Sequence, residues 1–134
     1  MRQLRNIAWI VFVLVLGFLA CVPVEGLGGQ SVITGRVQII DCNMELTNYL
    51  GTYYAYDEDV YLIYGEDSIP SDDVKISYNG YYRFEYLQAG HYTVYSMSED
   101  TTGESASGYY AVKKDVLIPD NGDEIGVEEI VIIK

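Results

Sequence analysis

Histidine, cysteine and positive charge are scarce in this sequence. Its 134 residues include one His and two Cys, and 8 Lys and Arg residues stand against 20 Asp and Glu residues. The single histidine, His91, has no second histidine and no recognisable nucleophile motif beside it, so the sequence does not supply a catalytic triad. Cys/His metal-ligand spacings and glycine-rich phosphate loops are also missing. We therefore expect a protein that is not an enzyme, with His91 as an exposed loop or strand-edge residue.

The shortage of basic residues leaves a strongly acidic chain, with a formal net charge of -12 at pH 7. Two of the basic residues, Arg2 and Arg5, belong to the first 20 residues, which contain no acid. Setting these two aside leaves 6 basic and 20 acidic side chains, a net charge of about -14. Because such a surface repels nucleic acid and anionic lipid headgroups, we expect no nucleic-acid partner.

The chain has one long hydrophobic run, which follows the positively charged segment Met1-Arg2-Gln3-Leu4-Arg5. The run covers residues 7–19 and is about 13 residues long. It is too short to cross a hydrocarbon core of roughly 30 Å, but its length is typical of a signal peptide. It ends at Phe18-Leu19-Ala20-Cys21, which resembles the lipobox of bacterial lipoproteins. In a lipobox a small residue precedes the cysteine that is acylated. Phe18 departs from the pattern, because leucine is usual there.

This resemblance implies that residues 1–20 are a lipoprotein-type signal peptide and that Cys21 carries the lipid, with palmitate among its acyl chains. Residues 21–30 would then form a tether, and residues 31–134 the folded domain. Attachment through diacylglycerol supplies two chains, which suffice for stable anchoring. We therefore expect an exported protein held by Cys21 in a membrane of the bacterial cell envelope, with the outer membrane as the expected location.

Two alternatives to acylation stay open. The signal could be cleaved in the ordinary way near Val24-Glu25-Gly26, or it could remain as an uncleaved anchor. The choice decides the state of the second cysteine, Cys42. If Cys21 is acylated, Cys42 has no partner; if it is not, the two cysteines could form a disulfide.

The segment from residue 31 onward predicts strands and turns, because no window repeats apolar residues at helical spacing. Seven strand-like stretches follow one another at intervals of roughly 8 to 15 residues, which is the spacing of a sandwich. They cover residues 31–40, 60–64, 74–78, 81–86, 92–98, 109–118 and 127–133. We therefore expect an all-β domain, a single seven-stranded Greek-key β-sandwich.

The pair Asn79-Gly80, between two of these stretches, predicts a two-residue type I′ hairpin in which both residues have positive φ. In the following strand Tyr82, Phe84 and Tyr86 share one face, and the charged side chains of Arg83 and Glu85 share the other. We expect Tyr82 and Phe84 to point into the core.

The segment Leu87-Gln88-Ala89-Gly90-His91-Tyr92 resembles the tyrosine corner of Greek-key sandwiches, in which the tyrosine hydroxyl bonds back to the connecting backbone. This gives structural roles to Leu87, Gly90 and Tyr92. Together with Gly35-Arg36-Val37, Val60-Tyr61-Leu62 and Gly80-Tyr81-Tyr82-Arg83-Phe84, the segment is similar to carboxypeptidase regulatory-like and Cna-B-like domains. These are sandwiches of the prealbumin (transthyretin-like) type. The resemblance implies a fold, and it implies no reaction.

Some Cna-B-like domains form an isopeptide between a Lys and an Asn. Here Arg36 stands where the Lys would be needed, and the last predicted strand has no Asn, so the resemblance implies no isopeptide. Transthyretin-like hydrolases need paired histidines, which this chain lacks.

Acidic residues gather in four places: 57–59, 66–67, 72–73 and 120–124. Calcium takes six to eight oxygen ligands from such loops, although the spacing is not that of an EF-hand. A weak calcium site where acidic loops meet is therefore one hypothesis, with Asp57, Asp59, Asp120 and Asp123 as candidate ligands. A solvated surface that blunts strand edges is the favoured alternative.

Tyrosine is abundant, with 14 residues. Tyrosine rings on an outer face can stack on sugars, and the candidates are Tyr53, Tyr54, Tyr61, Tyr81, Tyr95 and Tyr109. Amphipathic filling of a small sandwich is the alternative explanation. We expect a cell-envelope module for adhesion, assembly or scaffolding that contacts envelope proteins. The alternatives are a module that binds surface glycans, or a calcium-stabilised binding domain.

Overall fold

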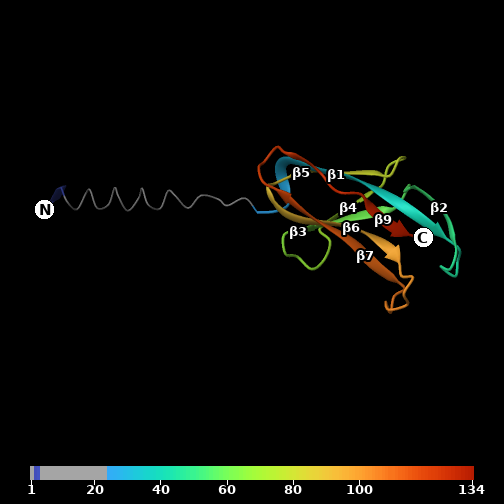
Figure 1. The fold of residues 1–134 in the computed structure, drawn as a ribbon. Helices are drawn as coiled ribbons and strands as arrows, with labels where there is room; N and C mark the ends of the chain where they lie inside the picture. Colours follow the sequence, from blue (N-terminus) through green and yellow to red (C-terminus); the bar gives the residue numbers. More distant parts are fainter. Residues whose placement is uncertain (1, 4–23) are drawn as a thin grey trace.

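A computed structural model of the chain describes residues 2–3 and 24–134 (Figure 1). Cys21 and nearly all of the predicted signal peptide therefore lie outside the described residues. None of the helical structure within the described residues is long and apolar enough to cross a membrane. The strands are β1 (Leu27–Cys42), β2 (Tyr49–Tyr54), β3 (Asp59–Tyr64), β4 (Asp72–Lys75), β5 (Tyr81–Leu87), β6 (Gly90–Glu99), β7 (Tyr109–Ile118), β8 (Glu124–Gly126) and β9 (Ile130–Ile133).

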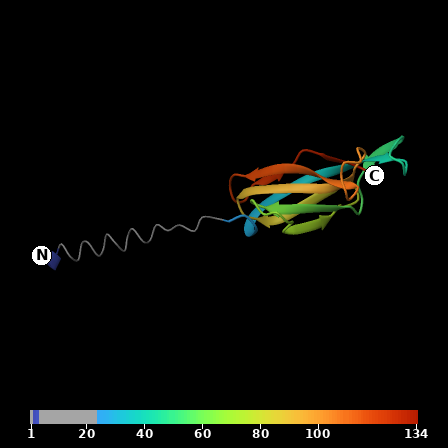
Figure 2. The same cartoon turned by 90° about the horizontal axis from the view of Figure 1, so that it is seen from below.

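Residues 24–134 contain no helix and form two packed sheets, so the predicted all-β sandwich is confirmed (Figure 2). The strands number nine in this part of the chain, against seven predicted. Strand β2 was not predicted because Gly51 interrupts it and its side chains are almost all exposed, which leaves no apolar alternation. Strand β8 has three residues and lies between the predicted strands 109–118 and 127–133.

The long strand β1 is the centre of a five-stranded sheet. Along one edge it pairs antiparallel with β5 and then with β2, and along its other edge it pairs parallel with β8 and then with β9. Val37 marks the change from β5 to β2, since its N–H donates to Gly80 O (2.8 Å) and its carbonyl accepts from Ala55 N (3.0 Å). The second sheet has the order β4-β3-β6-β7 and is antiparallel throughout.

The core lies between the two sheets and follows from alternation along the strands. The five-stranded sheet contributes Ile33, Val37, Ile39, Tyr82, Phe84, Leu87, Ile130 and Ile132, and the other sheet contributes Val60, Leu62, Tyr92, Val94, Val116 and Ile118. The inward orientation predicted for Tyr82 and Phe84 is confirmed. All core residues of the described chain lie between positions 33 and 132, so the fragment 24–134 contains this core.

The turn at Asn79-Gly80 differs from the prediction in two ways. Among non-glycine residues of the described chain, only Leu46, Asp57 and Tyr86 have positive φ, so Asn79 does not and the type I′ prediction is wrong. Ser77 O accepts from Gly80 N (3.2 Å), Ser77 N donates to Tyr81 O (2.9 Å), and Gly80 has φ +77. This is a three-residue loop with one left-handed residue. The loop also joins strands of different sheets, because β4 pairs with β3 whereas β5 pairs with β1.

The alternation predicted for β5 ends before Tyr86. This residue has φ +60 and is 68% exposed, whereas the next residue, Leu87, is completely buried. The pairing of β1 with β5 shifts register in the same region, since both Leu27 and Ser31 pair with Leu87. A bulge of this kind turns one side chain outward and returns the next to the core.

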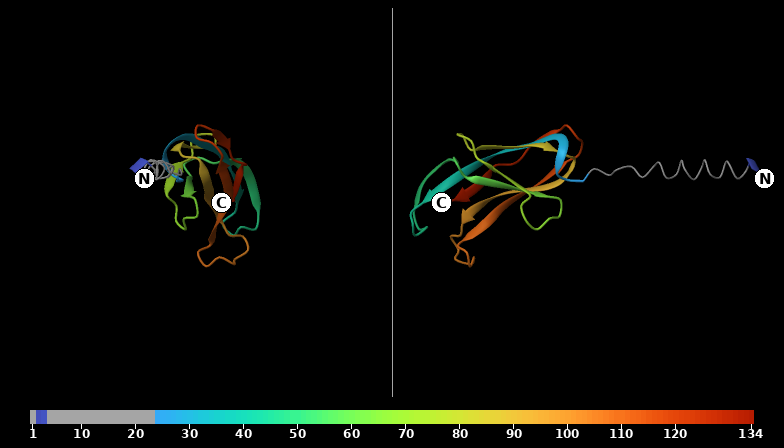
Figure 3. Two further views of the ribbon diagram at one scale, coloured as in Figure 1. Left: turned by 90° about the vertical axis from the view of Figure 1, so that its left-hand side faces the viewer. Right: turned by 180° about the vertical axis from the view of Figure 1, so that it is seen from behind.

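Strand β1 begins at Leu27, four residues before the expected start of the domain at residue 31. The start of β1 and the C-terminus lie at opposite ends of the sandwich, as Figure 3 shows. We call the end with the start of β1 and the loops 65–71, 88–89 and 119–123 the proximal end. The end with the turn 43–48 and the loop 100–108 is the distal end.

Candidate functional site

The outer face of the five-stranded sheet carries a basic side chain packed against two tyrosines. Alternation along β1 points Ile33 and Val37 into the core and Arg36 outward. The guanidinium carbon of Arg36 lies 3.3 Å from the ring centroid of Tyr54 and 4.5 Å from that of Tyr81. Both distances are within the range of cation–π interactions. We call these three residues the Arg36 cradle.

Strand pairing explains why these residues meet. Arg36 is the register partner of Tyr81 in β5, and the next outward residue of β1, Gln38, is the partner of Tyr54 in β2. The two tyrosines come from different strands along the same edge of β1. Cross-strand partners on one face lie about 5 Å apart, so a long arginine side chain can reach both rings.

The turn before β5 fixes the orientation of the guanidinium. Arg36 Nε donates a hydrogen bond to Asn79 O (2.8 Å). Only glycine fits at position 80, because a Cβ there would lie 2.5 Å from Val37 O. Gly80 therefore allows the close turn that brings the Asn79 carbonyl beside Arg36. The two terminal nitrogens of Arg36 form no hydrogen bond within residues 24–134, so they are available for a ligand on a side chain held by two rings and a backbone carbonyl.

Arg36 has no carboxylate within 4.0 Å among the described residues. Of the six basic side chains in residues 24–134, those of Lys75, Arg83, Lys114 and Lys134 form ion pairs. Arg36 and Lys113 do not, and Arg36 is the half-buried one of these two. In a chain with so many acidic groups, an unpaired and partly buried cation is a candidate for binding a ligand.

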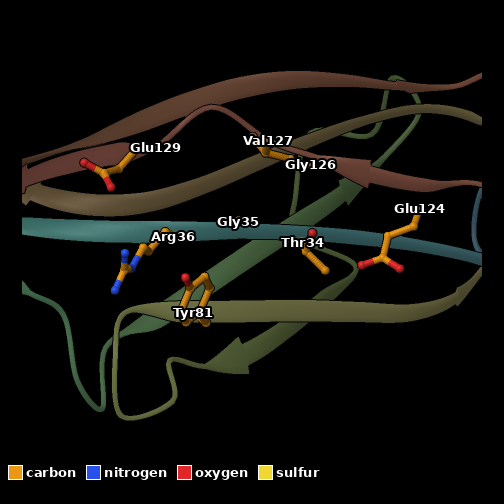
Figure 4. A pocket seen from close by; sticks show the side chains of 8 residues that line it. All are labelled: Thr34, Gly35, Arg36, Tyr81, Glu124, Gly126, Val127 and Glu129. Carbon is orange, nitrogen blue, oxygen red and sulfur yellow. The ribbon is translucent and has the colours of Figure 1, made fainter.

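A hollow of about 400 Å³ lies beside the cradle (Figure 4). Its walls come from β1, β5 and the segment around β8, and they are formed by Thr34, Gly35, Arg36, Tyr81, Glu124, Gly126, Val127 and Glu129. The figure shows the side chains of Arg36 and Tyr81 near one another, with the Glu129 carboxylate on the opposite wall. Glu124 also accepts from Arg83 (3.4 Å), and the bonds to Glu85 and then Glu124 raise the pKa of Arg83.

Gly35 lines this hollow with its backbone, and packing in the core requires glycine at this position. Its register partner is Tyr82, whose ring lies across it in the core. A Cβ at Gly35 would be 2.1 Å from the Tyr82 hydroxyl, so no larger residue fits. The Tyr82 hydroxyl has no hydrogen-bond partner, and burial raises its pKa well above the usual value.

The other tyrosines considered as sugar platforms are elsewhere. Tyr61 and Tyr95 lie in β3 and β6 of the second sheet and stack with ring centroids 5.0 Å apart. Tyr109 begins β7 in the same sheet. Tyr53 precedes Tyr54 in β2 and pairs with the inward-facing Ile39. The six candidates thus include two pairs, Tyr61 with Tyr95 and Tyr54 with Tyr81, and only the second pair packs against a basic side chain, that of Arg36.

The predicted corner residues lie at the proximal end. Tyr92 Oη donates to Gln88 O (2.7 Å) and accepts from Gly26 N (2.9 Å), and burial raises the pKa of this hydroxyl. Leu87 is completely buried, and Gly90 has φ +145. The bond from Tyr92 Oη to Gln88 O is the one that a tyrosine corner requires. The bond to Gly26 was not expected, because residue 26 was assigned to the tether.

The four candidate calcium ligands fall into two separate pairs, Asp57 with Asp59 and Asp120 with Asp123. The first pair lies beside Lys75 Nζ, at 3.8 and 3.0 Å, and Ser96 Oγ donates to Asp59 O. The second pair follows β7, whose last residue pairs with Gly90. Six residues of β6, about 20 Å, therefore separate the pairs. The described part of the chain holds no cluster of three potential metal ligands.

Two further predicted features have defined places. His91 is exposed near the start of β6, as expected. Cys42 ends β1 as a partly buried free thiol among the described residues, and its N–H donates to Lys134 O (2.7 Å). The positions considered for an isopeptide are not opposed across the core, since Arg36 points outward and Ile130 and Ile132 are the buried residues of β9.

Sequence reasoning did not identify Arg36 as a site residue, although the signal was present. The alternation of Ile33, Gly35 and Val37 already placed Arg36 on the outer face. The tyrosines that contact it are 18 and 45 positions away in the chain, so their proximity depends on strand register.

No protein-family model and no curated protein matches this sequence. Three chains of solved structures match its fold. One is the crystal structure of a proposed carbohydrate binding protein from Pseudomonas aeruginosa, with a TM-score of 0.46 and 12% identity. The match covers 82% of this chain and 92% of the other. At this degree of similarity, the ligand proposed for that protein cannot be assigned to this chain.

Proposed function

We propose that this protein is a non-enzymatic binding module of the bacterial cell envelope, anchored to the membrane through Cys21, and that its Arg36 cradle binds glycans. One observation carries the proposal. A partly buried arginine that has no carboxylate partner within residues 24–134 is oriented by Tyr54, Tyr81 and Asn79 O beside a hollow of about 400 Å³.

The chemistry of the cradle suits a sugar. Sugar rings have apolar C–H faces that pack on aromatic rings, and Tyr54 and Tyr81 are 40% and 52% exposed. Sugar hydroxyls both donate and accept hydrogen bonds. The guanidinium donates, the carboxylate of Glu129 accepts, and the Thr34 hydroxyl can do either. A small hollow with a few converging polar groups is also the usual form of a site for a small ligand.

A protein partner is the second candidate, and a different surface supports it. The distal end exposes large apolar side chains in and beside the turn 43–48. Met44 is fully exposed, and Tyr49 and Leu50 are 66% and 63% exposed. Exposed apolar groups gathered at one end are typical of protein contacts. Variants at this end and at the cradle separate the two candidates.

Affinity electrophoresis of the 24–134 fragment in gels that contain envelope polysaccharides tests the glycan proposal. We expect retardation of the parent fragment and a loss of at least tenfold in affinity, about 1.4 kcal/mol, for Tyr81→Ala and Tyr54→Ala. Tyr109→Ala is the matched control, because Tyr109 is 46% exposed on the other sheet. No retardation of the parent, or equal losses in all three variants, would contradict glycan binding at the cradle.

The anchor and the family assignment are further parts of the proposal. The lipobox-like segment that ends at Cys21 supports acylation, and the Tyr92 hydrogen bond to Gln88 O supports a relationship to carboxypeptidase regulatory-like and Cna-B-like domains. Cys21→Ala in the full chain should abolish lipid attachment. If this variant stays in the membrane fraction at an unchanged mass, acylation at Cys21 is wrong.

A further inference from the structure

The chain is fixed to the proximal end of the sandwich from Glu25 onward. Gly26 N donates to Tyr92 Oη (2.9 Å), and Gly26 O accepts from Gln88 N (2.8 Å). The carboxylate of Glu25 accepts from His91 N (3.3 Å). Bonds from its own backbone amide and from His91 N lower the pKa of Glu25. Gln88 Nε2 also donates to Leu27 O (3.0 Å).

These bonds shorten the free tether. Only residues 22–24 separate Cys21 from Glu25, so the two Cα atoms are at most about 14 Å apart. A tether that was free up to residue 30 would reach about 30 Å. With the shorter connection, the proximal end has to stay close to whatever holds Cys21.

The proximal end exposes apolar side chains beside the place where the described chain begins. Ile69, at the tip of the loop 65–71, is 74% exposed, and Val24 and Leu27 are 69% and 60% exposed. The loops of this end contain no Lys or Arg, and their charged residues are Glu66, Asp67, Asp120 and Asp123. Apolar side chains favour contact with a membrane interface, whereas carboxylates disfavour an anionic one.

We propose that the proximal end of the sandwich rests on a zwitterionic lipid surface, with Val24, Leu27 and Ile69 in contact with it. The long axis of the domain then points away from the bilayer surface. This proposal rests on the membrane anchoring at Cys21 that forms part of the proposed function. Leu27 pairs with Leu87 and Arg36 with Tyr81, six residues apart along β5 or about 20 Å, so the cradle faces sideways above the headgroups. The distal end faces away from the membrane.

Energy transfer to lipid tests this orientation. The full chain carrying Cys42→Ser receives one new cysteine, either Ser68→Cys at the proximal end or Ala106→Cys at the distal end, and each is labelled with a donor dye. The proteins are added to the outside of phosphatidylcholine vesicles that contain an acceptor lipid. We expect transfer from position 68 to exceed transfer from position 106 several-fold. The ten residues of β6 separate the two ends by about 30 Å.

A linker variant gives the matched control. Twelve Gly and Ser residues inserted after Val22 leave the Glu25 and Gly26 contacts intact but lengthen the tether, so transfer from position 68 should fall towards that from position 106. A second variant, Ile69→Gln, should lower transfer from position 68 by a smaller amount. Equal transfer from both positions in the parent chain, or greater transfer from position 106, would overturn the orientation.

The same set of proteins separates the two proposals. The chain with Cys42→Ser and no added cysteine has Cys21 as its only remaining thiol. Labelling of that chain would show that Cys21 is not acylated and would contradict the anchor. An unlabelled chain that stays bound to the vesicles, combined with equal transfer from both ends, would leave the anchor intact and reject the upright orientation.

Discussion

At the scale of single residues, two core tyrosines differ in how their hydroxyls are satisfied. Tyr82 and Tyr92 are both nearly fully buried, at 3% and 2% exposure. The Tyr82 hydroxyl has no partner, whereas the Tyr92 hydroxyl bonds Gln88 O and Gly26 N. A buried polar group without a partner costs about 1–3 kcal/mol, and a bonded one stabilises. The same substitution should therefore have opposite effects at the two positions.

Tyr82→Phe is expected to raise the free energy of unfolding of the 24–134 fragment, by up to about 1 kcal/mol, because it removes the unpaired hydroxyl. Tyr92→Phe should lower it by about 1–3 kcal/mol, because Gly26 N and Gln88 O lose their partner. Urea unfolding followed by fluorescence measures both. A loss of stability in Tyr82→Phe would mean that the Tyr82 hydroxyl is bonded in solution.

Asp100 provides a titration at the same scale. Its carboxylate accepts from Thr102 Oγ1 (2.6 Å), Ser105 N (2.6 Å) and Thr102 N (2.8 Å), and these bonds lower its pKa to about 2. A carboxylate whose pKa is lower in the folded state stabilises that state above the unfolded pKa of about 3.9. The contribution is lost as pH falls towards 2.

We expect the NMR signals of the Ser105 and Thr102 amides to shift with a midpoint near pH 2, and this transition to be absent in Asp100→Asn. Asp67→Asn is the control in another exposed loop, since the Asp67 carboxylate makes no hydrogen bond within the described residues. This variant should leave the shift of the two amides unchanged. A midpoint near pH 4 for the two amides would show that the loop bonds do not form in solution.

At the scale of elements, the segment from β4 to β5 combines a correct and an incorrect prediction. Local patterning identified a turn at Asn79-Gly80 and the inward side of β5, and both are present. It could not identify the sheet to which each strand belongs, since β4 and β5 obtain their partners from β3 and β1, which are distant in sequence. The outward turn at Tyr86 was missed for a similar reason, because the bulge depends on the path of β1.

The turn geometry gives a prediction at this scale. Asn79→Ala should change stability by less than about 0.5 kcal/mol, because Asn79 has negative φ and only its backbone carbonyl is used. Gly80→Ala should cost about 1–3 kcal/mol, because its φ is +77 and Val37 O leaves no room for a Cβ. Thermal unfolding of both variants distinguishes this turn from a type I′ turn, in which both substitutions would be costly.

At the scale of the whole molecule, the acidic charge is distributed rather than concentrated. The two pairs of candidate calcium ligands lie at different positions along the sandwich, and the first pair, Asp57 and Asp59, forms ion pairs with Lys75. The described carboxylates form ion pairs with four of the basic side chains, and these pairs are largely exposed. Surface pairs of this kind contribute little to stability.

The melting temperature of the 24–134 fragment should therefore be the same in millimolar calcium and in chelator, to within about 1 °C, since a ligand that does not bind the folded state does not stabilise it. Asp59→Asn, which weakens the contact with Lys75, serves as a control for a general charge effect and should respond in the same way. A rise of several degrees in the parent fragment that is lost in this variant would restore the calcium hypothesis.

The sequence by itself determined the all-β class, the inward face of β5, and the tyrosine corner, because alternation and short turn motifs act over a few residues. It also indicated export through a hydrophobic run and a cysteine that precede the domain. The tertiary structure decided which strands meet along β1, and hence that Arg36 packs against Tyr54 and Tyr81. It also decided that Glu25 and Gly26 dock on the Tyr92 corner. These contacts join residues up to 66 positions apart. They depend on strand register, which the packing of the whole core sets and no local pattern specifies.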